Sequence, residues 1–168
     1  MKKIKLTKNK IALVDNEDYE SLNKYKWYAS EVKGVFYAKR NVLRSNKGQE
    51  TILMHRVVLP SPIELDVDHI DNNGLNNQKS NLRVCTRSQN IMNSSLSNKN
   101  KSGYKGVSWH KGNNRYMSYI KLEYKQIHLG SFSDPIDAAL AYDVAAIKYH
   151  GEFAKTNKML GLLKVEGK

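Results

Sequence analysis

Clusters of β-branched and aromatic residues in the first 60 positions predict short strands rather than long helices. Three apolar runs carry this pattern, IALVD, GVFYAKRNV and QETILMHRVVL, and the turn signal SNKGQ lies between the last two. The polar stretch between the first two runs predicts a turn or a short helix. Residues 1–50 are therefore expected to form a β-rich region, and Pro60 and Pro62 end the last run.

The next segment alternates between short apolar runs and Asn-rich turns. VDHI is a strand candidate, NNG at 72–74 is a turn signal, and SNLRVCT is a second strand candidate. TRSQNIMNSS can begin a helix with Ser88 or Thr86 as its cap. We therefore expect residues 51–93 to contain a strand, a loop, a second strand and a helix, in this order.

Residues 94–103 are polar and contain a single apolar side chain, Leu96, and no aromatic one. Many of these residues form hydrogen bonds with their own backbone and favour loops. We expect a linker and a domain boundary here.

Beyond this linker, residues 104–158 predict a second domain. YKGVSWH, RYMSYIKLE and KQIHLGSF are three strand candidates, and the alternation in the second is the period of a half-buried strand. A helix is expected to follow, with Ser133 or Asp134 as its cap, Pro135 at its first position and Gly151 at its end. In this helix Ile136, Leu140, Val144 and Ile147 recur at helical spacing, and five alanines allow a close approach to the sheet, Ala138, Ala139, Ala141, Ala145 and Ala146. The fold class is therefore α+β, ending in a three-stranded antiparallel sheet packed on one helix and a tail at 159–168.

Charge and composition narrow the class of protein. The 28 Lys and Arg residues exceed the 16 Asp and Glu residues, which leaves a net charge of +12 that both halves of the chain share. A surplus spread in this way indicates a long polyanion as partner. Cys85 is the only cysteine, so neither an internal disulfide nor a cysteine zinc cage is expected. No apolar run approaches a membrane span or a secretory signal, so a cytoplasmic protein without a membrane partner is expected.

Asp68, His69, Asn81 and Asn90 form the most suggestive group of polar residues. An Asp carboxylate and an Asn carboxamide suit a hard cation such as Mg²⁺ and leave most of its coordination to water and phosphate oxygens. A neighbouring His can accept a proton from water. Taken alone, the same residues also fit a surface hydrogen-bonded pair beside Asn-rich turns.

The stretch DHIDNNGLNNQKSNLRVCTRSQN, with the upstream MHRVVL, resembles the HNH endonuclease motif, the ββα-metal nuclease site of phage and intron-encoded homing endonucleases. The resemblance implies that His69 is the general base, that Asp68 and Asn90 hold one divalent metal, and that Asn81 shapes the loop between the strands. The last motif position is Asn90 rather than a second His. This difference favours Mg²⁺ or Mn²⁺ over zinc.

Four further residues near the motif have less specific expectations. His55 is expected to position the site from beneath rather than bind the metal. Arg83 and Arg87 are expected either to hold backbone phosphates or to lie on a solvated face. Asp71 is expected to stabilise the turn.

The C-terminal string resembles the plant ethylene-response-factor, or APETALA-type, DNA-binding domain. The matching segments are YKGV, LGSF, AALAYDVAA and HGEFAKTN. The resemblance implies a sheet that binds DNA, and Lys105, Arg115 and Lys121 match basic positions of that family. In the sequence itself, basic and aromatic side chains interleave on the expected sheet face, which suits either a DNA groove or a hairpin with solvated charges. These residues are Lys105, Trp109, Lys111, Arg115, Tyr119, Lys121 and Lys125. Ser108, His110, Gln126 and His128 occupy places that the plant domains often fill with Arg or Trp, so the plant target sequence is not expected to carry over.

The sequence as a whole favours an HNH homing-type endonuclease of a phage-infected or bacterial cell, acting on double-stranded DNA as a monomer or weak dimer. One such site cuts one strand, so a nicking enzyme is one form of this hypothesis. The alternative is a non-catalytic DNA-binding or regulatory protein that retains an HNH-like scaffold. An RNA-binding protein is a weaker alternative, because the stacking motifs of single-stranded RNA modules are not evident.

Overall fold

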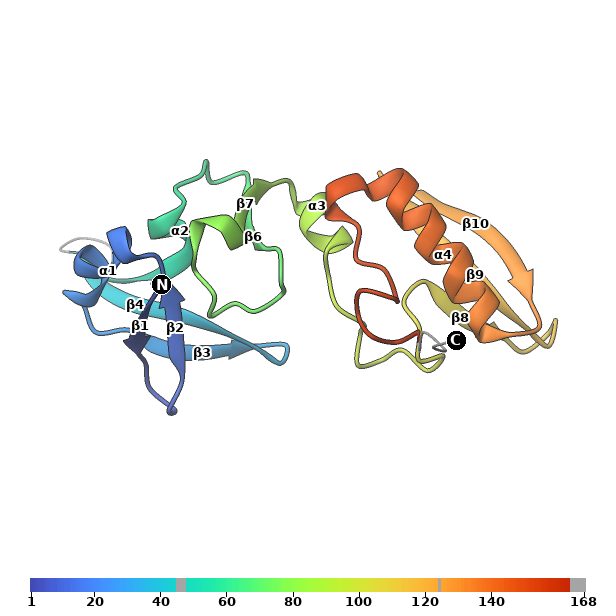
Figure 1. Cartoon of the computed structure of the whole chain (residues 1–168), viewed down its shortest axis with the longest axis horizontal. Helices are drawn as coiled ribbons and strands as arrows, with labels where there is room; N and C mark the ends of the chain where they lie inside the picture. The colour runs from blue at the N-terminus through green and yellow to red at the C-terminus, as the bar shows by residue number, and fades with distance from the viewer. Residues whose placement is uncertain (45–47, 124, 164–168) are drawn as a thin grey trace. The chain divides into compact units, whose positions relative to one another are not determined.

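The structure is a computed structural model in which residues 1–44, 48–123 and 125–163 are described (Figure 1). The chain divides into two compact units, Met1–Arg87 and Ser88–Lys168. The polar stretch 94–103, expected as a linker, falls within the second unit. Its Asn100 Nδ2 donates to the Tyr104 carbonyl at 2.9 Å and its Ser102 Oγ donates to the Val107 carbonyl at 2.8 Å. These bonds attach the stretch to the first strand of the second unit.

The first unit is built from three small antiparallel sheets and short helices. The order is β1 (Lys2–Lys5), β2 (Ile11–Val14), α1 (Asn16–Asn23), β3 (Tyr28–Val32), β4 (Val35–Arg44), β5 (Gly48–Leu53), α2 (Met54–Val58), β6 (Asp66–His69), the 3-10 turn η1 (Lys79–Asn81) and β7 (Leu82–Cys85). β1 pairs with β2, β4 lies between β3 and β5, and β6 pairs with β7. The β-rich N-terminal region is therefore confirmed.

One hydrophobic core joins the N-terminal strands to the β6–β7 hairpin. It contains Val14 and Trp27 from the N-terminal region, Met54 from α2, and Val67 and Leu82 from the hairpin. Met54 and Val14 are completely buried. The two-stranded hairpin would be only marginally stable alone, because an isolated hairpin buries little apolar surface. The N-terminal region therefore supplies most of the packing that holds β6 and β7.

The second unit begins within the short helix α3 (Arg87–Met92), which starts directly after Thr86. It continues with β8 (Val107–His110), β9 (Arg115–Leu122), β10 (Lys125–Phe132), α4 (Pro135–His150) and the 3-10 turn η2 (Gly151–Phe153). β9 is the central strand, both of its pairings are antiparallel, and α4 lies across the sheet (Figure 1). The expected α+β class and the three-stranded sheet packed on one helix are confirmed.

Helix α4 follows the expected start and stop signals. The Asp134 side chain accepts a hydrogen bond from the Ile136 amide at 2.7 Å, Pro135 occupies the first turn, and Gly151 ends the helix with φ of 54°. Its small residues face the sheet, as expected. Four alanines of α4 are buried: Ala138, Ala139, Ala145 and Ala146. Ala141 is only half-buried.

The chain after α4 returns to the start of β8 through a buried polar cluster. Asn157 is fully buried, and its Oδ1 accepts a hydrogen bond from the Lys105 backbone amide at 2.7 Å. The backbone amide of Asn157 donates to Asp143 Oδ1 at 2.6 Å. Asp143 Oδ2 also accepts from the Lys158 amide at 2.9 Å. Buried polar groups are stable only when they are hydrogen-bonded, and this cluster satisfies that requirement. Asp143 therefore has a structural role.

One expected strand is a helix in the structure, and one expected turn lies partly outside the described residues. MHRVVL was expected to continue a strand, but β5 ends at Leu53 and residues Met54–Val58 form α2. That expectation was wrong because Met54, His55 and Val58 recur at helical spacing and all three are buried. The turn signal SNKGQ includes residues 45–47, which lie outside the described residues.

Within the described part of the chain, the structure contains no helix whose length and hydropathy would let it cross a bilayer.

Gly106 provides a test of the packing in the second unit. Its φ is +78°, and a Cβ atom would lie 1.9 Å from Cδ2 of the buried Tyr142 ring. We expect Gly106→Ala to lower the free energy of unfolding by about 3 kcal/mol, because backbone strain and overpacking both act. Gly103→Ala is the matched control, since φ is +82° but no atom lies within 4 Å, and a cost of about 1 kcal/mol is expected. Urea unfolding followed by circular dichroism measures both variants, and equal losses would contradict the packing argument.

Candidate functional site

Asp68 and Arg83 face each other across the β6–β7 hairpin. The two residues are direct partners in the strand register. Arg83 donates from Nε and Nη2 to Oδ2 of Asp68, at 3.0 and 2.9 Å. Only 5% of Asp68 is exposed, and a buried carboxylate is costly unless a charged partner also forms hydrogen bonds with it. The sequence suggested either phosphate binding or a solvated face for Arg83, and its guanidinium contacts this carboxylate.

His69, the residue after Asp68, is a buried imidazole at the end of β6. Burial lowers the pKa of His69 below its usual value, against a hydrogen bond with Asn77 and the charges of Asp71 and Asp68, which raise it. The ring is therefore kept in its neutral form at neutral pH. A neutral imidazole beside a carboxylate can accept a proton.

Two aromatic rings enclose His69, and one of them was missed by sequence reasoning. The His55 ring lies 5.0 Å from the His69 ring, centroid to centroid, at 90°, and the Tyr37 ring lies 5.9 Å from it. Burial, with the charges of His69 and Arg56, lowers the pKa of His55 to about 3. Nδ1 of His55 is buried and has no hydrogen-bond partner among the described residues. His55 thus lies against the His69 ring and is buried rather than at the surface.

Tyr37 comes from β4, in the N-terminal region outside the motif. Burial and the charge of Asp68 raise the pKa of the Tyr37 hydroxyl. A Cβ atom on Gly74 would lie 2.6 Å from Cδ1 of this ring, so only glycine allows the loop to approach so closely. Gly74 in the turn NNG is the only sequence signal for this contact, and it does not indicate which ring is approached.

Asn81 holds the loop between β6 and β7 in shape. Its Oδ1 accepts from the Asp71 amide at 3.0 Å, and its Nδ2 donates to Asp71 Oδ1 and to the Asn76 carbonyl, both at 2.9 Å. Asp71 also accepts from the Asn73 amide at 2.8 Å. Through these contacts Asn81 fixes the conformation of the loop between β6 and β7. Asp71 is part of the same network, in keeping with its expected place in the turn.

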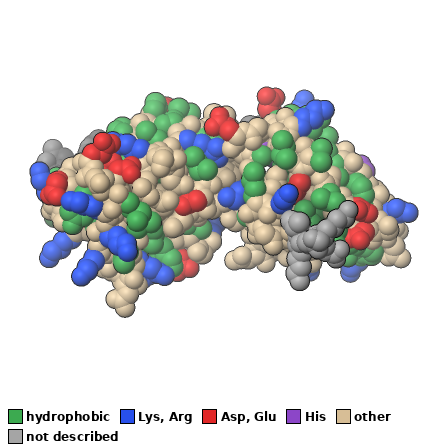
Figure 2. Space-filling view, viewed as in Figure 1, with side chains coloured by type: hydrophobic (Ala, Val, Ile, Leu, Met, Phe, Trp, Pro, Cys, Tyr) green, Lys and Arg blue, Asp and Glu red, His purple; other side chains and the backbone are tan. Residues whose placement is uncertain are grey.

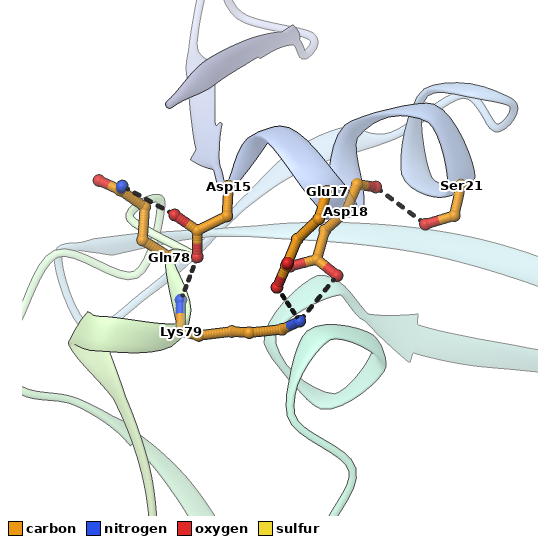
Figure 3. Close-up of polar contacts among 6 residues, drawn as sticks. All are labelled: Asp15, Glu17, Asp18, Ser21, Gln78 and Lys79. Atoms are coloured by element: carbon orange, nitrogen blue, oxygen red, sulfur yellow. Dashed lines mark hydrogen bonds and ion pairs between the residues drawn. The ribbon is translucent and has the colours of Figure 1, made fainter.

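The end of this loop is fastened to the start of α1 (Figure 3). The two carboxylate oxygens of Asp15 accept from Gln78 Nε2 at 3.1 Å and from the Lys79 amide at 2.8 Å. Lys79 Nζ pairs with Glu17 and lies 3.4 Å from Asp18 Oδ1. The hydrogen bonds from Gln78 and Lys79 lower the pKa of Asp15. The loop that carries the motif asparagines is therefore anchored by residues outside the motif.

The remaining residues of the predicted site lie at the boundary between the two units. Arg87 begins α3, and its Nη1 lies 3.1 Å from Oδ2 of Asp66 on β6. Asn90 lies on α3 within the second unit, whereas Asp68 belongs to the first. The structure therefore places the two predicted metal ligands in separately described units.

The donor set fits one kind of metal ion better than others. Across the ranges 1–44, 48–123 and 125–163, no three His, Cys, Asp or Glu side chains come together as a metal-binding cluster. One carboxylate and one carboxamide are oxygen donors, which suit a hard divalent cation with several water or phosphate ligands. A closed zinc cage would need nitrogen or sulfur ligands in larger number.

Strand register decides which of the predicted DNA-binding residues share a face of the second sheet. Directly paired residues on neighbouring strands lie on the same face. Ile120 belongs to the core with α4, so the predicted DNA-binding residues of β9 that alternate with it, Arg115, Tyr119 and Lys121, face away from the helix. Their cross-strand partners are His110, His128 and Gln126 respectively. We call these six residues the outer sheet face.

Trp109 and Lys125 were expected on this face, but the register puts them on the other one. Trp109 pairs with Tyr116, its ring lies 4.7 Å from the Tyr116 ring, and Lys125 pairs with Leu122. Both partners alternate with the outer residues of β9. Lys111 lies in the turn between β8 and β9 and is exposed.

Lys105 also differs from its expected role. Its Nζ donates to the carbonyl oxygens of Met92 and Ser94, at 2.7 and 2.6 Å. Burial, together with the charge of Lys155, lowers the pKa of Lys105 to about 8. The ammonium group therefore binds the backbone at the end of α3, and a phosphate would have to compete with these carbonyls.

Similarity to known proteins agrees with both parts of the chain. Residues 54–92 match the family profile described as HNH endonuclease. An uncharacterized HNH endonuclease of Acanthamoeba polyphaga mimivirus is 30% identical over 152 residues, which cover 90% of this chain and 77% of the viral protein. Protein 3.8 of Escherichia phage T7 is 32% identical over 96 residues, 57% of this chain and 78% of the phage protein.

A third similarity is partial and concerns plant proteins. An ethylene-responsive transcription factor of Arabidopsis thaliana is 45% identical over 56 residues, which are 32% of this chain and 30% of the plant protein. It supports a C-terminal DNA-binding domain.

The buried Asp68 and His69, the loop held by Asn81 and the helix that carries Asn90 all lie within the segment that matches the family profile. The viral relative extends this similarity over most of both chains. This chain therefore belongs to the HNH endonuclease family.

Proposed function

We propose that the protein is a DNA endonuclease of the homing type, which hydrolyses a phosphodiester bond with His69 as the general base. One observation carries this proposal: a buried imidazole, kept neutral, directly follows a buried carboxylate in the segment that matches the HNH endonuclease profile. In this role His69 accepts a proton from the attacking water. General base catalysis of this kind contributes about 10²- to 10⁴-fold to a rate.

The rings of Tyr37 and His55 act on the base by fixing its orientation. Both rings meet the His69 ring edge to face, at 5.9 and 5.0 Å. A side chain enclosed in this way loses little further freedom when substrate binds, so its geometry is set in advance. Both are positioning residues in this proposal, and neither touches the phosphate.

Asp68 and Asn90 would hold the divalent metal ion, Mg²⁺ or Mn²⁺. When bound, this ion supplies positive charge to the oxygens of the scissile phosphate. Arg83 contacts Oδ2 of Asp68 and so fixes the direction of the carboxylate. Charged partners behind a metal ligand commonly orient it in this manner.

The outer sheet face is the proposed docking surface for double-stranded DNA. Arg115 and Lys121 bring positive charge, and the rings of Tyr119 and His128 on the same face lie 5.1 Å apart, tilted by 44°. A small antiparallel sheet can enter the major groove, where side chains reach both bases and phosphates. Similarity to the plant transcription factors supports the same surface.

A second function is favoured by one specific contact. The ion pair between Asp68 and Arg83 stabilises the buried carboxylate without any metal ion. A DNA-binding or regulatory protein with an HNH scaffold would keep this pair for stability alone. Incubation with supercoiled plasmid distinguishes the two functions: nicked or linear product that requires Mg²⁺ supports the nuclease, and a shifted but intact plasmid supports the binding protein.

His69→Ala tests the base. We expect plasmid cleavage to fall by at least about 100-fold, because the proposed acceptor of the proton from water is removed. DNA binding in a gel-shift assay should persist, since phosphate contacts elsewhere supply most of the affinity. Glu64→Gln, at an exposed position before β6, is the control and should cleave at the normal rate. Full cleavage by His69→Ala would refute the assignment.

Asp68→Asn tests the metal ligand. The substitution keeps the shape of the side chain but removes its charge, so Mg²⁺ should bind more weakly and Mg²⁺-dependent cleavage should be lost. Calorimetric titration with Mg²⁺ measures the first effect and the plasmid assay the second. Cleavage that persists in a chelator would contradict the role of the metal.

Lys121→Ala and Lys105→Ala form a matched pair for the DNA surface. If Lys121 meets a phosphate, its loss should make the plot of log binding constant against log salt concentration less steep. The slope should change by about one unit. Lys105→Ala should leave the slope unchanged and instead lower the stability by about 1–3 kcal/mol, because two carbonyl groups lose a donor. Equal changes of slope in the two variants would contradict this distinction.

A further inference from the structure

The solvent side of α4 carries a continuous apolar stripe. Ile136, Leu140, Val144 and Ile147 are 46%, 49%, 70% and 62% exposed. Figure 2 shows hydrophobic side chains gathered over this helix. The four residues recur every three or four positions, which brings them onto one side of a helix. We call them the α4 stripe.

The cores formed by the described residues of the second unit do not include this stripe. The side of α4 that meets the sheet is formed by Ala138, Ala139, Ala145 and Ala146 together with Tyr142. A helix on a soluble domain normally places polar residues opposite its buried side. Adjoining exposed apolar residues commonly mark a surface that binds another protein.

The charges beside the stripe show which partner fits it. Asp137 lies near the start of α4 and Lys148 near its end, and both are exposed. They are about three helical turns apart, so they lie along the same edge of the stripe. No ion pair within the described part of the chain includes Asp137 or Lys148. The helix therefore carries a negative charge at one end of an apolar stripe and a positive charge at the other.

We propose that the α4 stripe binds a second copy of this chain, with the two helices antiparallel about a two-fold axis that crosses the stripe between Leu140 and Val144. In a two-fold interface each contact occurs twice, with the roles of the copies exchanged. Ile136 then meets Ile147 of the other copy, and Leu140 meets Val144. The same operation brings Asp137 opposite Lys148 at each end, so both charges gain a partner.

The size of this surface sets the strength of the dimer. One helix from each copy buries less than the roughly 800 Å² per partner of a standard stable interface, so the dimer is weak. Binding of both copies to one DNA molecule would raise their effective concentration and favour pairing. If the proposed nuclease function holds, such a pair brings two active sites to one DNA, one for each strand. The pairing itself does not depend on that function.

Sedimentation equilibrium of the full chain without DNA, from about 5 to 500 µM, tests the stripe. We expect reversible dimerisation at the upper concentrations. Leu140→Glu and Val144→Glu should each weaken it at least tenfold, because a charge would be buried twice in the interface. Met159→Glu is the matched control, since Met159 is also an exposed apolar residue of the second unit but lies outside α4, and it should dimerise normally. A wild-type chain that stays monomeric at every concentration would overturn the proposal.

Charge reversal tests the antiparallel register. Asp137→Lys and Lys148→Asp should each weaken the dimer about tenfold, because each places like charges together at both ends. The double variant Asp137→Lys, Lys148→Asp restores opposite charges and should recover dimerisation. An effect on helix stability alone would instead be largest in the double variant, and circular dichroism measures it separately. Dimerisation that the single variants do not weaken, or that the double variant does not recover, would overturn the antiparallel pairing.

Discussion

The ion pair between Asp68 and Arg83 is the interaction on which the geometry of the candidate site depends. A carboxylate that is 5% exposed would be strongly destabilising without its guanidinium partner. The pair forms only when β6 and β7 keep their register, because a shift by one residue would turn each side chain to the opposite face. The same register brings His69 to the end of β6, beside the ring of His55. One electrostatic requirement therefore constrains the positions of both Asp68 and His69.

That register is in turn held from outside the hairpin. The loop between the two strands closes through Asn81, and its far end is bound by Asp15 at the start of α1. Tyr37 from β4 fills the space beside Gly74, where a larger residue would separate the loop from the sheet. The N-terminal region is thus a structural part of the site, although the sequence motif does not include it.

The sequence predicted those features that depend on local chemistry. The strand with Asp68 and His69, the loop at Asn81 and the capped helix after Asp134 all follow from short-range signals. It did not predict that Tyr37 lies beside His69, because that contact joins residues far apart in the chain. It misplaced Trp109 and Lys125 because the faces of a sheet follow from register, which single strands do not reveal. It also treated α2 as a strand, since a short apolar run such as MHRVVL fits either structure.

The Lys105 ammonium donates hydrogen bonds to the carbonyl groups of Met92 and Ser94. These bonds affect where the C-terminal domain could be replaced by a different one. The polar stretch 94–103 resembles a natural junction for joining a different DNA-binding module to the nuclease. A junction there would keep α3, the helix on which Asn90 lies. It would discard Lys105, whose ammonium group binds the carbonyl at the end of this helix. A chimaera that preserves this contact would have to exchange the chain beyond Lys105, or supply an equivalent cation from the incoming module. A junction in this stretch therefore has to preserve the contacts of Lys105 as well as those of Asn100 and Ser102.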